Sequence, residues 1–63
     1  MKENILKELR ILAEKYHKAP YLVLDWYNEL IELKYLKPLE FLKKHLELKD
    51  NIDFQIAKFR LKH

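Results

Sequence analysis

The chain contains no glycine among its 63 residues, and this absence constrains the fold more than any other feature of the sequence. Tight β-hairpin turns need residues with a positive backbone φ angle, which glycine adopts at the lowest steric cost. Any turn of that kind must here use Asn, Asp, Lys or His. A sheet of short hairpins is therefore disfavoured, and we expect an all-α fold.

The length permits one domain, residues 1–63, and limits how much apolar surface that domain can hide. A domain this short buries only about 60% of the surface that its unfolded chain exposes. Such domains usually need a disulfide, a metal or a partner subunit. Cysteine is absent, and three widely spaced histidines make a poor metal site. Since 49% of the residues are hydrophobic, we expect some apolar surface to remain for a partner.

Two prolines and the spacing of the apolar residues divide the chain into helical segments. Pro20 and Pro38 suit the first turn of a helix, where the missing N–H group is not needed. Helical spacing predicts a first helix over residues 4–17, with Asn4 as its N-cap, and a second over residues 20–36. The second helix is apolar on most sides, which is typical of a helix at the centre of a domain or between chains.

The sequence pattern predicts two more helices in the last third of the chain. A third helix after Pro38 would carry an apolar face formed by Leu39, Leu42 and Leu46. Asp50 or Asn51 would then cap a final segment over residues 52–61. That segment also alternates partly as an edge strand would, through Ile52, Phe54 and Ile56. We favour the helix, and hence a compact bundle of three or four short helices.

Residues 12–26 resemble, without gaps, the core of a helix-turn-helix unit. Ala13 corresponds to the small residue that lets the two helices approach, and Tyr16 to the aromatic residue that closes the first helix. Pro20 opens the second helix, and Val23 and Trp26 would pack that helix inward. The resemblance implies a helix-turn-helix-like first pair of helices.

The same resemblance implies DNA binding, but the outward residues of the second helix differ from those of a reading helix. A reading helix presents basic or amide side chains to the bases and phosphates. Residues 21–36 contain one basic residue, Lys34, against three acidic ones, Asp25, Glu29 and Glu32. The turn also carries His17 and Lys18 where the family usually has glycine and an aliphatic residue, and Ala19 replaces the usual Ser or Thr cap.

We therefore expect a protein interface on the second helix, because aromatic residues with aliphatic neighbours dominate binding energy in interfaces. The candidate residues are Tyr21, Leu22, Leu24, Asp25, Trp26 and Asn28. Trp26 could instead belong to the core. If the chain binds nucleic acid, we expect the contacts to come from Lys43, Lys44, Lys49, Lys58, Arg60 and Lys62. The basic residues of the last segment could equally complement the negative end of a helix dipole.

The residue types argue against an enzyme, since the chain has no Cys, Ser or Thr to act as a nucleophile. We expect a non-enzymatic regulator, adaptor or inhibitor, without cofactor or metal, that binds a protein partner or a second copy of itself. The alternative is a DNA-binding transcriptional regulator with a degenerate helix-turn-helix and a basic C-terminal third. No apolar run approaches the roughly 18–20 residues of a membrane span, and the amino terminus is unlike a signal peptide, so we expect a cytoplasmic protein.

Overall fold

A computed structural model describes residues 3–62, which form four helices and no strand. The helices are α1 (Glu3–Lys15), α2 (Pro20–Glu32), α3 (Pro38–Glu47) and α4 (Ile52–Lys62). The all-α bundle expected from the sequence is confirmed, and the final segment is a helix rather than a strand. Asn4 lies inside the first turn of α1, so the prediction that it is the N-cap was wrong.

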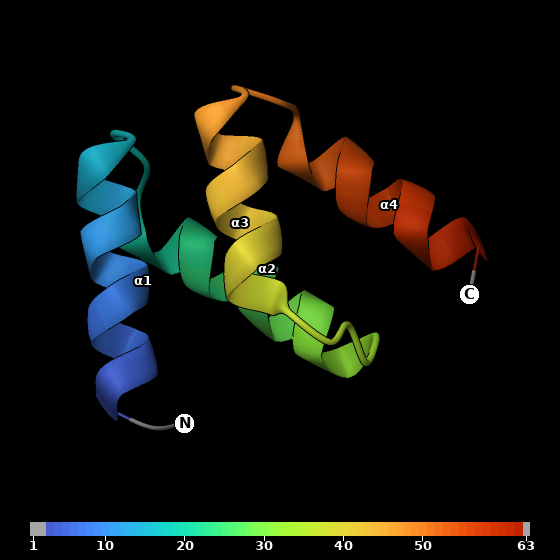
Figure 1. The fold of residues 1–63 in the computed structure, drawn as a ribbon, viewed down its shortest axis with the longest axis horizontal. Coiled ribbons are helices and arrows are strands. Elements are labelled where there is room, and N and C mark those ends of the chain that lie inside the picture. Colours follow the sequence, from blue (N-terminus) through green and yellow to red (C-terminus); the bar gives the residue numbers. More distant parts are fainter. Residues whose placement is uncertain (1–2, 63) are drawn as a thin grey trace.

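The central element of the bundle is α2, which packs against each of the other three helices. It begins beside α1 and passes behind α3 (Figure 1). The helices α1 and α3 run in the same direction and end at the same end of the molecule. The fourth helix lies on the opposite flank from α1 and packs against α2 and α3. The burial of α2 therefore positions every other element.

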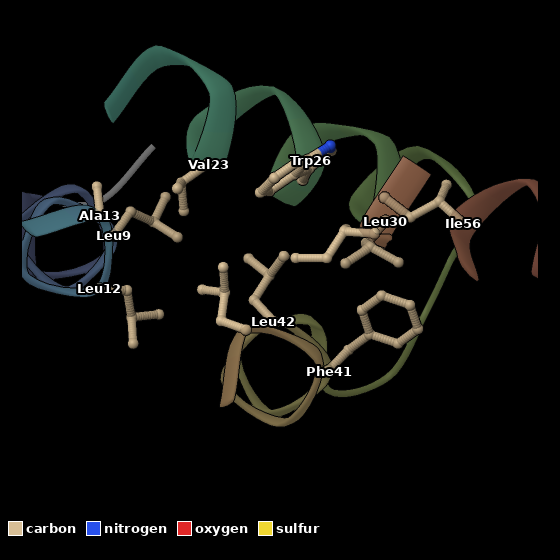
Figure 2. Packing of buried hydrophobic residues seen from close by; sticks show 11 residues of the cluster. Leu9, Leu12, Ala13, Val23, Trp26, Leu30, Phe41, Leu42 and Ile56 are labelled. Carbon is tan, nitrogen blue, oxygen red and sulfur yellow. The ribbon is translucent and has the colours of Figure 1, made fainter. Parts of the chain in front are cut away.

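The core is a single cluster of apolar side chains from all four helices (Figure 2). Ala13 is fully buried, and its small side chain lets α2 approach α1 closely. Val23 and Leu30 point from α2 into the same cluster and are also fully buried. The members of the cluster are Leu9, Leu12, Ala13, Val23, Trp26, Leu30, Phe41, Leu42, Leu46, Ile52 and Ile56.

Each of the first three helices is followed by a residue with a positive φ angle: His17 (56°), Lys34 (62°) and Lys49 (58°). In each case the next N–H group donates to the carbonyl oxygen five residues earlier, at 2.8 to 3.0 Å. This arrangement is the Schellman motif, in which glycine normally takes the left-handed position. Lys and His fill that position here, as the absence of glycine predicted.

The same motif explains why the first two helices are shorter than predicted. The second helix ends at Glu32 rather than near residue 36, because the Tyr35 N–H group folds back onto the carbonyl oxygen of Leu30. The first ends at Lys15 rather than near residue 17 for the same reason. Helical spacing of apolar residues continues through such a turn and so does not mark the end of the helix.

The N-terminal ends of the later helices follow the sequence more closely. Pro20 and Pro38 each occupy the first turn of a helix, and neither helix has a side-chain cap. The fourth helix is capped by Asn51, whose Oδ1 atom accepts a hydrogen bond from the Phe54 N–H group at 3.0 Å. The prediction of a cap at residue 50 or 51 is confirmed.

Two polar contacts join α2 to α4. The Trp26 indole N–H group donates to Asp53 Oδ1 at 2.9 Å, at the edge of the core. One helical turn further along α2, Glu29 forms an exposed ion pair with Arg60 at 3.1 Å. Exposed ion pairs contribute about 0–1 kcal/mol, whereas an unpaired indole N–H group at a buried ring is more costly. The Trp26–Asp53 hydrogen bond is therefore the more important of the two contacts.

Replacing Lys34 by glycine should stabilise the fold. A left-handed residue other than glycine costs about 1–2 kcal/mol, and part of that gain is lost because glycine also adds freedom to the unfolded chain. We expect K34G to raise the free energy of unfolding by about 0.5–1 kcal/mol in a urea titration. K34A is the control, because alanine removes the same charge but keeps the Cβ atom. A K34G variant no more stable than K34A would contradict this account.

Asp53→Ala should destabilise the fold by about 1 kcal/mol, because the Trp26 N–H group loses its acceptor. Asp53→Asn keeps an acceptor oxygen but loses the negative charge near the N-terminus of α4. Comparing the two variants therefore separates the contribution of the hydrogen bond from that of the charge at the helix dipole. We expect D53A to lower the midpoint of urea unfolding more than D53N does. Equal losses in the two variants would assign the effect to charge alone.

Candidate protein interface

Four of the six predicted interface residues share the outer face of α2. Tyr21, Asp25 and Asn28 are exposed and Leu24 is half-buried, and their spacing of three to four residues places them on one side of the helix. Tyr21 is 72% exposed, which is high for an aromatic residue. The outer face of α2 therefore presents both apolar and polar groups to solvent.

The other two predicted residues lie elsewhere. Trp26 is 6% exposed and belongs to the core, with its indole N–H group bound to α4. Leu22 is half-buried and packs against the core cluster, one helical turn before Trp26. The prediction that Trp26 contributes to the interface was therefore wrong. The sequence shows that α2 is apolar on most sides, but not which side faces its own chain.

The structure adds residues that sequence reasoning missed. A hollow of about 120 Å³ lies between α1 and the start of α2, and Leu6 and Arg10 line it together with Tyr21 and Leu24. Further along α2, the side chain of Ile31 is 48% exposed. Leu6 could have been noticed as an apolar residue outside the buried stripe of its helix. We call this region the Tyr21 surface: Leu6, Arg10, Tyr21, Leu24, Asp25, Asn28 and Ile31.

The charge of the outer face of α2 is negative. Asp25 and Glu32 are exposed beside the apolar side chains, and the thirteen residues of α2 include no basic one. Arg10 of α1 is the basic member of the Tyr21 surface. A partner with apolar side chains and basic groups facing these carboxylates would match this surface, whereas a phosphate backbone would not. In a symmetric pair of copies, Arg10 of each chain is the basic group that could face Asp25 of the other.

The six predicted nucleic-acid contacts are all exposed, but the structure does not bring them together. Arg60 is paired with Glu29. Lys43 lines a hollow beside two acidic residues, Glu8 and Glu47. Lys58 and Lys62 lie on α4, which extends away from the end of α3, where Lys49 is found (Figure 1). Lys44, on α3, is exposed as well. The six residues are therefore spread over α3, the turn that follows it and α4.

Instead, Lys49 lies beside two lysines that sequence reasoning did not select. A cleft of about 360 Å³ between the ends of α1 and α3 is lined by Lys15, Lys18 and Lys49, together with His17 and His45. Lys15, His17 and Lys18 precede His45 and Lys49 by about thirty residues, so no local pattern indicated that they would meet. This basic cleft is separate from the Tyr21 surface.

One histidine in the basic cleft has a fixed orientation. The Nδ1 atom of His45 lies 2.7 Å from Asp50 Oδ2, and its ring packs against Phe41 with 4.4 Å between the ring centroids. Among residues 3–62, no group of three or more His, Asp or Glu side chains could hold a metal ion. The His45 side chain is therefore held on one wall of the cleft by two contacts.

Comparisons with known proteins found no match for this chain. No protein-family model matches the chain, and no curated protein or solved structure is significantly similar to it. None of the four described helices is long and apolar enough to cross a membrane.

Proposed function

We propose that this chain is a non-enzymatic regulator, adaptor or inhibitor that binds a macromolecular partner through the Tyr21 surface. The observation that supports this most directly is the exposure of Tyr21, Ile31 and Leu6 around the half-buried Leu24. Tyrosine and arginine are enriched among the residues that dominate binding energy in protein interfaces, and the Tyr21 surface contains one of each. The partner proposed first is a second copy of the chain.

The dimensions of the molecule indicate how such an interface would be built. A stable interface hides about 800 Å² on each partner, which is roughly a sixth of the 5006 Å² that this chain exposes. The broad face of the molecule measures 30 by 25 Å, and α2 forms the far layer in a view along the shortest axis (Figure 1). A partner of ordinary size would therefore cover most of that face, including α2 and the adjoining side of α1.

Tyr21→Glu should abolish self-association and leave the helical fold intact, because the side chain is exposed and a charge there would be buried in the complex. Sedimentation equilibrium over a range of concentrations measures the effect, and circular dichroism checks helicity. We expect a dimer for the unmodified chain and a monomer for Y21E and for Leu24→Glu.

Leu36→Glu provides the matched control. Leu36 is 94% exposed and lies in the connection between α2 and α3, away from the Tyr21 surface. It should leave the association unchanged. If L36E lowers association as much as Y21E does, the Tyr21 surface is not the interface; if the unmodified chain is monomeric at every concentration, the second copy is not the partner.

The alternative function is DNA binding, which the packing of the first two helices favours. Ala13 and Val23 are buried between α1 and α2, at the positions where a helix-turn-helix unit places its packing residues. Because the outer face of α2 is acidic, the contacts would come from lysines near the turn and from the C-terminal third rather than from a reading helix.

DNA binding is tested by its salt dependence. Three phosphate contacts would weaken binding to mixed duplex DNA about 40-fold between roughly 50 and 200 mM salt, because each contact releases counterions. Fluorescence anisotropy of a labelled duplex measures the affinity. Undetectable binding at the lower salt concentration would remove this alternative, while the sedimentation result would be unaffected.

A further inference from the structure

The basic cleft exists because α1 and α3 end at the same end of the molecule (Figure 1). Its walls come from the last turn of each helix and from the residues that follow. Its volume of about 360 Å³ is near the lower limit for small-molecule sites, which span about 300–1,000 Å³. The lining residues are Lys15, Tyr16, His17, Lys18, His45, Leu46, Lys49 and Asp50.

The charges of the cleft favour an anion. Three lysines line it, and within residues 3–62 none of them forms an ion pair; Lys15 lies over the Tyr16 ring, 5.4 Å from its centroid. The single carboxylate, Asp50, is engaged by His45 at 2.7 Å. The two helix C-termini add about half a negative charge each, but the N–H groups of the Schellman motifs already occupy carbonyl oxygens there. Positive charge remains in excess.

The donors suit phosphate oxygens in particular. Each lysine ammonium group carries three N–H donors on a flexible stem, and lysine binds phosphate as a point charge. The three lysines come from α1, the turn after it and the turn after α3, so they surround the cleft from both sides. His17 and His45 add imidazole groups to the same walls. Such a set can contact several oxygens of one ligand at once.

We infer that the basic cleft binds a small anion with two or more phosphate groups, such as pyrophosphate or the phosphate chain of a nucleotide. A single phosphate group carries about −1.5 to −2 charges at pH 7, fewer than the three lysines of the cleft can balance. This site is independent of the Tyr21 surface, so the failure of one proposal leaves the other standing.

The chain supplies a well-matched pair of variants for the test. Lys49 and Lys34 both follow a helix, with φ angles of 58° and 62°, in the same Schellman motif. Glycine at either position removes one lysine and relieves the same backbone strain, so both variants should fold at least as stably as the unmodified chain. Only Lys49 lines the basic cleft. A difference in anion binding between K49G and K34G therefore reflects the loss of a lysine from the cleft and not a change in stability.

The experiment is an NMR titration of the ¹⁵N-labelled chain with pyrophosphate, ATP and a short single-stranded oligonucleotide, in separate arms at low ionic strength. Sodium chloride at matched ionic strength controls for screening. We expect saturable shifts at residues 15–18 and 45–50 with pyrophosphate and ATP. We also expect binding to weaken about fivefold in K49G and to be unchanged in K34G and Y21E.

Two results would overturn the inference. One is that shifts spread over all lysines, including Lys34 and Lys37, or that K49G and K34G bind equally well. The other is that the oligonucleotide binds in the cleft while pyrophosphate and ATP do not, which would assign the cleft to nucleic acid and not to a small anion.

Discussion

The burial of one side of α2 is the constraint on which the rest of the structure depends. The chain has no cysteine, so the packing of this helix against the other three must hold the fold together. Val23 and Leu30 are fully buried on that side, and Trp26 adds a hydrogen bond to α4 at the edge of the core. Because only this side of α2 packs in the core, the opposite side of this largely apolar helix remains exposed to solvent. The Tyr21 surface is therefore a consequence of the way in which the fold is stabilised.

Sequence reasoning predicted the architecture well, because the relevant signals are local. The missing glycine, the two prolines and the cap at Asn51 each act within a few residues, and all were interpreted correctly. The helix ends were harder, since nothing in the identity of Lys34 announces a left-handed conformation. That conformation follows from where the next helix must begin, which depends on the packing of the whole chain.

The candidate sites were predicted only in part, for reasons of distance along the chain. Tyr21 and Leu24 could be selected from the helix that carries them, but their neighbour Leu6 comes from another helix. Trp26 was wrongly assigned to the interface because the acceptor of its indole N–H group, Asp53, lies 27 residues later in the sequence. The basic cleft was missed altogether, since it joins the ends of two helices. Single-helix patterns cannot show which ends meet.

The distribution of charge among the helices affects how the molecule approaches a charged partner. Acidic and basic residues are balanced in α1 and in α3, whereas α2 carries only acidic ones and α4 is basic. Each connection between helices contains at least one lysine: Lys18, then Lys34 and Lys37, then Lys49. The charge is thus unevenly distributed over a weakly cationic molecule. A charged partner would rotate it during diffusion, so that orientation is partly selected before any side chains touch.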